Sequence, residues 1–283
     1  MVSGFMKSIV KRLCRKRSIP LSIRRKLAAP FIKRDSTEFA ICVDGQEFHG
    51  RLDNYIEWVV YVTGQFFEFS YINLIKSIGL SGCALDIGAN VGNHTLAYSA
   101  FFDEVVSLEP YTPIYDRLKE KADKLTNVIT YNVAFGNQSG EIGFTPPRTS
   151  NFGTGRVDSE GELKVEIVRG DEFLPGKIGK IGFIKIDVEG HEFEVLKGLA
   201  HTLDNDLPAV LFEAPIAVRA NGGQALLDSF KLFPIDYRFF GLKGQTSFPI
   251  QRQIAKAYPI TQHNSGTRYT NILAIPPQIP FQI

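Results

Sequence analysis

Leu85-Asp-Ile-Gly-Ala-Asn-Val-Gly-Asn-His-Thr95 is the stretch of this sequence that decides the fold. It continues an apolar run that predicts a strand over 83–87, and it opens a helix predicted over 93–101. Gly88 allows a tight turn after the strand, and Gly92 lets the backbone approach a ligand closely. The pattern therefore predicts a strand–loop–helix unit that binds a ligand at its loop.

An acid at the end of the next predicted strand narrows the choice of ligand. Glu109 follows Asp86 by about 23 residues, and an acid near that offset accepts hydrogen bonds from ribose hydroxyls in Rossmann-type sites. A dinucleotide site would need a third glycine three residues after Gly92, which this chain lacks. S-adenosylmethionine (SAM) has a ribose but no phosphate, so Asp86 would not repel it. SAM is therefore the expected cofactor, and a glycine-rich turn without a ligand is the alternative.

Short apolar runs alternate with helical segments from Cys83 onward. Strands are predicted over 83–87, 104–109, 128–135, 181–187, 209–213 and 269–276, and helices over 93–101, 114–125 and 192–203. Near-continuous Val, Ile and Leu runs that alternate with helices are typical of a parallel sheet covered on both faces. The sequence therefore predicts an α/β fold of the Rossmann-like class, with residues 81–283 as its domain.

Two further segments depart from this rhythm. Residues 35–80 predict short strands from Glu38 to Val62, with a hairpin turn at Asp44-Gly45, and then a helix over 69–78 packed on the core. Residues 136–179 are rich in Gly, Ser, Pro and Asn, with strand-like pieces at 141–144 and 163–168. We interpret them as an inserted hairpin or flap over the site, with a mobile surface loop as the alternative.

The net charge of +2 hides a strong asymmetry along the chain. Residues 1–34 contain 11 bases and no acid, which leaves 21 bases against 30 acids in the rest. Apolar residues lie among these bases at helical spacing, so a basic amphipathic arm could contact an anionic membrane peripherally. A solvated tail, or an arm docked on its own acidic body, is the alternative.

The sequence gives no sign of a membrane span or of an exported protein. No run reaches the roughly 18 apolar residues that a span needs, and bases interrupt the apolar residues of the N-terminus. The three cysteines are far apart and suggest neither a zinc site nor a disulfide framework. We therefore expect a cytoplasmic protein, at most peripheral to a membrane.

Three charged residues alternate with apolar ones at the end of the strand predicted over 181–187. Lys185, Asp187 and Glu189 share one face of the chain there, beside the cofactor loop. They could form a structural ion pair, or a carboxylate could orient or deprotonate an acceptor hydroxyl; we favour Asp187, ahead of Glu189 and His191. Asp187, Glu189 and His191 could also offer ligands to a metal, but we expect no metal requirement.

Several motifs together resemble the FkbM-type methyltransferases. They are Asp86-Ile-Gly-Ala-Asn-Val-Gly92, Leu108-Glu-Pro110, Asn132-Val-Ala134, Ile184-Lys-Ile-Asp-Val-Glu-Gly-His-Glu192, Val195-Leu-Lys-Gly198, Phe212-Glu213 and Asn271-Ile-Leu-Ala-Ile275. The resemblance covers about residues 38–276 and implies a class I fold with a mostly parallel seven-stranded sheet. It implies SAM-dependent methyl transfer, usually to oxygen, with sugar or polyketide hydroxyls as acceptors. The cofactor residues expected from loop and resemblance are Asp86, Gly88, Asn90, Gly92, Asn93, Glu109, Pro110, Val133, Ala134 and Asp187.

Other functions compete with O-methylation of a sugar, glycan or secondary metabolite. The basic arm suggests nucleic-acid or protein methylation, but Asp187-Val-Glu-Gly190 stands where base methyltransferases usually carry an Asn/Asp-Pro-Pro-aromatic motif, so we expect no nucleic-acid partner. A nicotinamide-linked oxidoreductase is disfavoured by the missing third glycine. A non-catalytic SAM-binding protein remains a further alternative. The identity of the acceptor and the oligomeric state stay open.

Overall fold

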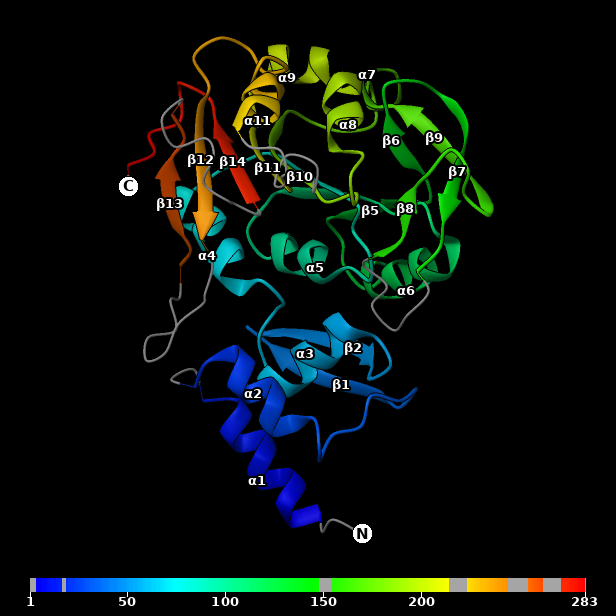
Figure 1. Cartoon of the computed structure of the whole chain (residues 1–283), viewed down its shortest axis with the longest axis vertical. Coiled ribbons are helices and arrows are strands. Elements are labelled where there is room, and N and C mark those ends of the chain that lie inside the picture. Colours follow the sequence, from blue (N-terminus) through cyan, green and yellow to red (C-terminus); the bar gives the residue numbers. More distant parts are fainter. Residues whose placement is uncertain are drawn as a thin grey trace.

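An eight-stranded sheet forms the centre of the molecule in the computed structural model, which describes residues 4–16, 19–147, 154–213, 223–243, 254–261 and 271–282 (Figure 1). Its order is β13-β12-β14-β11-β10-β3-β4-β5. The bounds are β3 (Cys83–Ile87), β4 (Glu104–Leu108), β5 (Val128–Tyr131), β10 (Ile181–Ile186), β11 (Ala209–Glu213), β12 (Arg238–Lys243), β13 (Lys256–Pro259) and β14 (Asn271–Ile275).

The sheet confirms the predicted Rossmann-like architecture. Strands β5, β4, β3, β10 and β11 run parallel, while β14 lies antiparallel to both of its neighbours. These strands with β12 make the predicted seven, and β13 adds an eighth at the edge of the sheet. The strand predicted over 128–135 divides, because its last residues join a second sheet as β6 (Ala134–Gly136).

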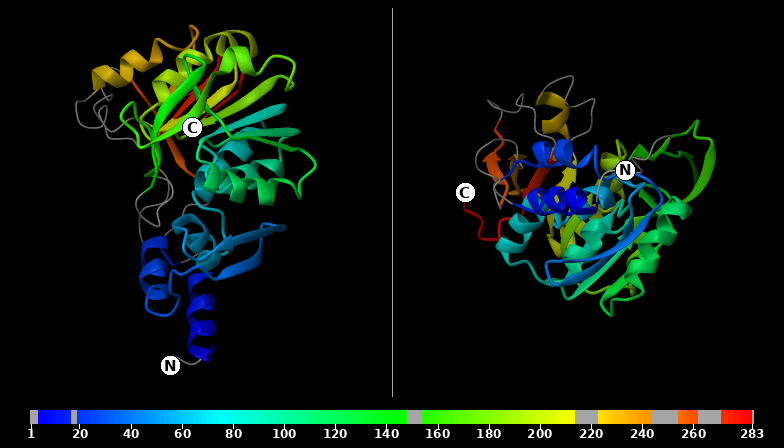
Figure 2. Two further views of the ribbon diagram at one scale, coloured as in Figure 1. Left: turned by 90° about the vertical axis from the view of Figure 1, so that its right-hand side faces the viewer. Right: turned by 90° about the horizontal axis from the view of Figure 1, so that it is seen from below.

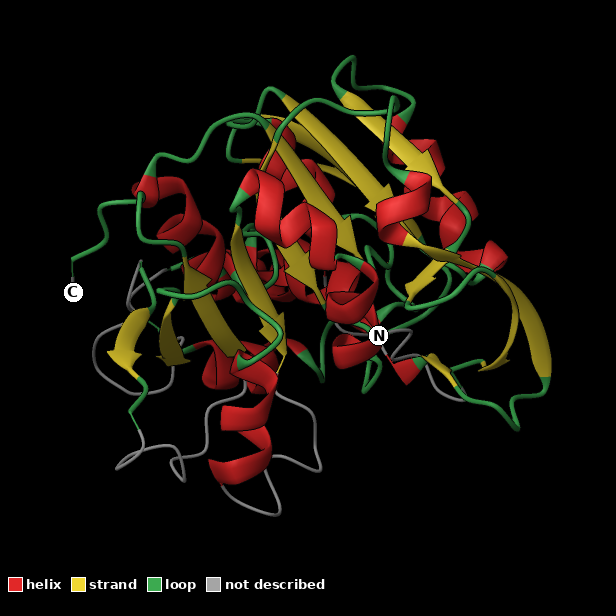
Figure 3. Ribbon diagram, turned by 90° about the horizontal axis from the view of Figure 1, so that it is seen from above, coloured by secondary structure: helices red, strands yellow, loops and turns green. Residues whose placement is uncertain are grey.

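Helices cover both faces of the sheet (Figures 1 and 3). One face carries α4 (Phe69–Ile78), α5 (Asn93–Ser99) and α6 (Thr112–Ala122), and the other carries α8 (Glu192–Gly198), α9 (Ala200–Asp206) and α11 (Gly223–Phe230). Alternate residues of β3 enter different cores: Leu85 and Ile87 pack with α8 and α9, while Ala84 packs with α4 and α5. The helix predicted over 192–203 is thus two helices, α8 and α9.

The inserted segment forms the second sheet, in the order β6-β9-β7-β8. Strand β7 (Gly140–Thr145) pairs antiparallel with β9 (Leu163–Arg169) and with β8 (Arg156–Val157), and the short helix α7 (Gly170–Phe173) follows. Both strand-like pieces predicted in this segment are therefore strands. Its movement as a flap stays a prediction.

The segment before the core contains the hairpin that the sequence predicts. It also contains a helix, α3 (Tyr55–Thr63), that the sequence does not predict. Strands β1 (Glu38–Val43) and β2 (Gln46–Arg51) turn at Asp44-Gly45, where both residues have positive φ as a type I′ turn requires. The expected strand up to Val62 is wrong, because α3 spans Tyr55–Thr63. The side chain of Asn54 accepts the N–H of Glu57 at the start of this helix, and Gly64 ends it in the left-handed conformation.

A buried carboxylate holds α3 against the core. Glu57 is fully buried and accepts hydrogen bonds from Lys121 Nζ at 2.8 Å, from the guanidinium of Arg117 and from the backbone N–H of Arg51. Both bases belong to α6, so the cluster joins α3 to α6. The free-energy cost of burying the charges of Glu57 and Lys121 is offset because each has a charged partner.

The basic arm is helical and packs on α3. Helices α1 (Gly4–Cys14) and α2 (Leu21–Ala28) lie at one end of the long axis, with the N-terminus at the tip (Figures 1 and 2). A buried cluster unites them with α3, and Trp58 Nε1 donates to the carbonyl oxygen of Ile32 at 3.1 Å. This cluster contains residues from both sides of the domain boundary that the sequence predicts after residue 34. The boundary itself stays a prediction. None of the helices in the described ranges is long and apolar enough to span a membrane.

Candidate active site

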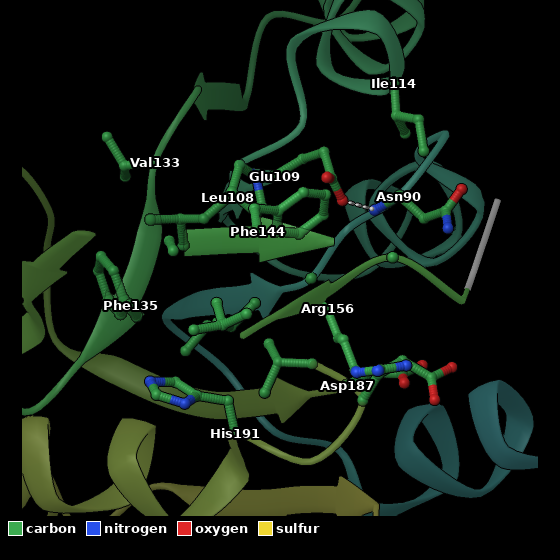
Figure 4. A pocket seen from close by; sticks show the side chains of 18 residues that line it. Asn90, Leu108, Glu109, Ile114, Val133, Phe135, Phe144, Arg156, Asp187 and His191 are labelled. Carbon is green, nitrogen blue, oxygen red and sulfur yellow. Dashed lines mark hydrogen bonds between the residues drawn. The ribbon is translucent and has the colours of Figure 1, made fainter. Parts of the chain in front are cut away.

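Two adjoining cavities open at the carboxyl ends of β3, β4 and β10. The first, here called the ribose pocket, lies beside the loop that follows β3 (Figure 4). It is lined by Ile87, Gly88, Asn90, Leu108, Glu109, Pro110, Ile114, Val133, Ala134, Phe135, Phe144, Gly155, Arg156, Val157, Asp187, Val188, Glu189 and His191. Residues from the second sheet therefore close one side of it.

Glu109 is the polar centre of the ribose pocket. Only 6% exposed, it accepts hydrogen bonds from the backbone N–H groups of Asn90 (3.1 Å) and Tyr111 (2.9 Å). Burial raises the pKa of Glu109 to about 7, although the two N–H donors oppose this rise. Each carboxylate oxygen keeps a further lone pair, so the group can accept hydroxyl donors from a ligand. Pro110, Val133 and Ala134 supply apolar wall beside it.

The glycines of the loop have different roles. Gly88 has a φ of 81°, and a Cβ there would lie 2.0 Å from the carbonyl oxygen of Asp187, so only glycine allows these two loops to touch. Gly92 also has a positive φ, but its Cα faces Leu118 of α6, and it lines neither cavity. Gly92 therefore permits close packing of two helices, and its contact with a ligand stays a prediction.

Asp86 lines neither cavity, whereas Asn93 lines the second cavity and also holds two segments together. Asp86 is fully buried, and its Oδ2 accepts the hydroxyl of Thr95 at 2.7 Å. Within the described part of the chain its Oδ1 has no hydrogen-bond partner. The Asn93 side chain accepts from the N–H of Phe67 (2.8 Å) and donates to its carbonyl (3.0 Å). Asn93 therefore clamps the residues before α4 to the start of α5.

The second cavity, here called the charged cleft, shares Gly88, Asn90, Asp187 and Glu189 with the ribose pocket. Its remaining walls come from distant parts of the chain: Tyr55, Ile56, Phe67, Glu68, Ala89, Asn93, His94, Lys185, Glu213 and Asn271. A ligand that lies over Gly88 and Asn90 can therefore reach into both cavities.

Lys185 and Asp187 form the ion pair that the sequence left open. Lys185 Nζ lies 2.9 Å from Asp187 Oδ2, and the lysine side chain is 5% exposed while the aspartate is 39% exposed. Burial alone would lower the pKa of Lys185, but Asp187, Asp86 and Glu68 outweigh it and raise that pKa. The pairing fixes Asp187 at the point where the two cavities meet, and the carboxylate still faces solvent.

The predicted catalytic residues separate into two places. The carboxylates of Asp187, Glu189 and Glu213 have oxygens within 4.8 Å of one another, a grouping that could hold a cation. His191 is absent from this group and lines the ribose pocket, on the side opposite Glu109 (Figure 4). Burial lowers the pKa of His191, which favours a neutral imidazole. His191 itself does not line the charged cleft.

Sequence reasoning missed the residues that the other segments bring to the site. Glu68 and His94 lie 3.4 Å apart in the charged cleft, and Phe144 and Arg156 of the second sheet line the ribose pocket. Glu68 has a positive φ of 57° just before α4, an uncommon conformation for a glutamate. The sequence carried no signal that these distant segments meet, because periodicity reports faces of elements and not their neighbours.

Comparison with known proteins identifies relatives of this site. Residues 86–218 match the family model described as the methyltransferase FkbM domain. The hexuronic acid methyltransferase AglP of Haloferax volcanii is 34% identical over 149 residues, which are 52% of this chain and 62% of that protein. The chain thus spans less than two thirds of this relative.

Solved structures give a weaker likeness. The methyltransferase FkbM of Methylobacillus flagellatus KT aligns with 95% of this chain and 58% of its own at a TM-score of 0.48 and 15% identity. TYW2 of M. jannaschii, solved in complex with AdoMet, aligns with 85% of each chain at a TM-score of 0.41 and 12% identity. Both TM-scores are below 0.5, and the class of the fold follows from the strand order of the central sheet.

Proposed function

We propose that this chain, which carries an FkbM methyltransferase domain over residues 86–218, transfers the methyl group of SAM to a sugar hydroxyl. One observation carries the proposal: a pocket with a buried hydroxyl acceptor, Glu109, opens at Gly88 and Asn90 into a cleft with a fixed carboxylate, Asp187. That arrangement suits a cofactor with a ribose at one end and a reactive group at the other.

The hydrogen-bond acceptor, the apolar walls and the negative charges of the two cavities fit SAM. Glu109 would accept the ribose hydroxyls, and Pro110, Val133 and Ala134 would contact the base. Gly88 and Asn90 would lie under the sulfonium, where the nearby carboxylates Asp86 and Asp187 favour a positive charge. Gly92 and Asn93 would act indirectly, by holding α5 and the Phe67–Glu68 segment in place.

Methyl transfer to an alcohol needs an oriented oxygen and an exit for its proton. SAM supplies an electrophilic methyl group when it is bound. Asp187, held by Lys185, would accept a hydrogen bond from the acceptor hydroxyl and take its proton as the methyl group passes from the sulfonium to that oxygen, which leaves the cofactor as a neutral thioether. Glu189 lies close enough to share the hydroxyl. His191 would serve the cofactor side instead of the acceptor.

The acceptor class follows from the relative and from the cleft. AglP is by name a hexuronic acid methyltransferase, and a sugar presents several hydroxyls that Glu189, Glu213 and Asn271 could hydrogen-bond. A sugar, free or within a glycan, is therefore favoured over a protein or a nucleic acid. A non-catalytic binding role is also disfavoured, because the ion pair with Lys185 holds the carboxylate of Asp187 beside the position that we propose for the reacting hydroxyl.

Labelled SAM provides the test. Calorimetry should show binding of SAM and of its demethylated product, with much weaker binding of NAD. Incubation with methyl-labelled SAM and a panel of sugars, uronic acids and lipid-linked glycans should label a sugar oxygen, located by mass spectrometry. Stronger binding of NAD, or label transferred to protein or nucleic acid but to no sugar, would contradict the proposal.

We also propose a peripheral attachment of this protein to an anionic membrane through residues 1–34. It is supported by the 11 bases of the arm and by its position at the end of the molecule (Figure 2). Such an attachment would keep a cytoplasmic enzyme close to sugars carried on lipids.

A further inference from the structure

The apolar residues of α1 and α2 are divided between two faces. Val10, Cys14 and Ala28 are buried against α3. The large aliphatic residues of the other face are exposed: Ile9 by 39%, Leu13 by 36%, Ile23 by 41% and Leu27 by 40%. Packing on the body thus explains one set of apolar residues and leaves the second set in solvent.

The exposed Ile and Leu residues form one pair on each helix, and the exposed Met6 (44%) precedes Ile9 by three residues in α1. Ile9 and Leu13 are four residues apart in α1, and Ile23 and Leu27 are four residues apart in α2, so each pair lies on one side of its helix. The two helices also contact each other. We call these four side chains the aliphatic face of the arm.

A buried arginine fixes the two helices to the body. Arg24 of α2 has no exposed surface, and its Nη1 donates to the carbonyl oxygen of Cys14 at 3.1 Å and to Gln65 Oε1 at 3.2 Å. These bonds tie α2 to the end of α1 and to the segment after α3. The aliphatic face is therefore held in a defined orientation.

Exposed bases lie close to this face along the chain. Arg12, Lys16 and Lys26 are exposed and each follows one of the four aliphatic residues by three positions, and the first 34 residues contain no acid. Other bases of the arm lie on the body, such as Lys11, whose ammonium is 4.0 Å from the ring centre of Tyr61. Long basic side chains can extend from an apolar surface towards headgroups while their stems remain in apolar contact.

We infer that the aliphatic face inserts into the surface of an anionic membrane, with the nearby exposed bases on the lipid headgroups. This inference rests on the proposed peripheral attachment and deepens it by naming the residues that enter the bilayer. Aliphatic residues close to bases suit a surface that is both apolar and negatively charged. A second copy of the chain is disfavoured as the partner, because like charges would face each other. Nucleic acid is disfavoured as the partner, because its phosphate backbone offers no apolar surface to the four residues of the aliphatic face.

Vesicle sedimentation of the full-length protein tests the inference. The probes are vesicles of phosphatidylcholine alone and vesicles that also contain phosphatidylglycerol. The variants are Ile9→Ser with Leu13→Ser, Ile23→Ser with Leu27→Ser, and Arg12→Gln with Lys16→Gln. Leu163→Ser serves as the matched control, because Leu163 is equally exposed (40%) on β9, away from the arm.

Wild type and Leu163→Ser should sediment with the anionic vesicles only. Each aliphatic pair variant should bind at least tenfold more weakly, and this loss should persist when salt is lowered. The Arg12/Lys16 variant should bind more weakly at moderate salt and recover part of its binding at low salt. All variants should keep wild-type SAM affinity, which shows that they are folded.

The outcomes separate this inference from the broader proposals. If both aliphatic pair variants sediment like wild type, the attachment is purely electrostatic, and the inference that the aliphatic face inserts into the membrane is wrong. If wild type itself stays in solution with anionic vesicles, the attachment fails as well. Methyl transfer to a soluble sugar is measured separately, so neither result bears on the proposed reaction.

Discussion

The ribose pocket and the charged cleft share four residues but are built in different ways. The ribose pocket is lined by residues between 87 and 191, all within the stretch that matches the family model. The charged cleft takes walls from α3, from the start of α4 and from β14, which lie outside that match. A cofactor pocket can be made by consecutive strand–helix units, whereas the acceptor cleft depends on how distant segments meet.

This difference assigns separate tasks to the two cavities. In the ribose pocket burial dominates, and one carboxylate stands among apolar walls. In the cleft, charges dominate, and a lysine is surrounded by carboxylates. We therefore expect changes in the ribose pocket to alter cofactor affinity and changes in the cleft to alter turnover.

The largest effect should come from Asp187→Asn. Loss of the carboxylate that orients the hydroxyl should lower kcat by about 10²- to 10⁴-fold, the usual contribution of a positioned base. The Kd for SAM should rise by a smaller factor than kcat falls, since Asp86 still favours the sulfonium and one hydrogen-bonding oxygen remains at residue 187. Single-turnover kinetics and calorimetry measure the two effects separately.

Asp123→Asn is the matched control for that change, because Asp123 is an exposed partner of Lys119 far from the cleft. It should leave both quantities unaltered. Near wild-type turnover in Asp187→Asn would make Asp187 a structural partner of Lys185 only, and the division of tasks between the cavities would fail.

Glu109→Ala should give the complementary result. The ribose hydroxyls lose a charged acceptor, so SAM affinity should fall by about 1–3 kcal/mol, or roughly 5- to 150-fold. At saturating SAM, kcat should stay within a few-fold of wild type. Calorimetry gives the affinity, with the exposed Glu141→Ala on β7 as control. A larger effect on kcat than on affinity would reverse the assignment.

The pKa of Glu109 predicts a smaller effect of pH on the same affinity. Hydroxyl donors favour the ionised carboxylate, so SAM binding should lower this pKa from about 7 and release a proton. Affinity should therefore rise with pH up to about 7, by at most about tenfold per pH unit, and level off above. Calorimetry at several pH values checks this. A dependence that persists in Glu109→Gln would point to another group.

The smallest effect is expected from chelation. Asp187, Glu189 and Glu213 could hold a cation, but the ion pair with Lys185 already supplies a positive charge to Asp187. EDTA should therefore change turnover by less than about twofold. Loss of activity that Mg²⁺ restores would show that the cleft works through a metal.

Much of the core could be predicted because its signals are local. An apolar run followed by glycines and a helical pattern needs only neighbouring residues, so the strands ending at Ile87 and Leu108 and the turn at Asp44-Gly45 were predicted correctly. Residues at the ends of parallel strands meet by topology alone, which brought Glu109 and Asp187 to one pocket.

The errors arose where tertiary contacts decide the outcome. The residues of α3 are aromatic and β-branched, which favours a strand, yet Asn54 and Gly64 cap a helix that buries Trp58, Val59 and Val62. The packing of Gly92 against Leu118 is likewise a contact that no local pattern reveals. The partners of Glu68 and His94 were hidden for the same reason.

Trp58 has a practical consequence for the arm, because it is the only tryptophan in the chain. Its ring is 3% exposed in the cluster that joins the arm to α3, and its N–H is bonded to Ile32. Indole fluorescence shifts to longer wavelength when water reaches the ring. The emission spectrum therefore reports whether α1 and α2 remain packed on α3. On anionic vesicles the emission maximum should stay unchanged if they remain packed, and it should shift to longer wavelength if they separate from α3.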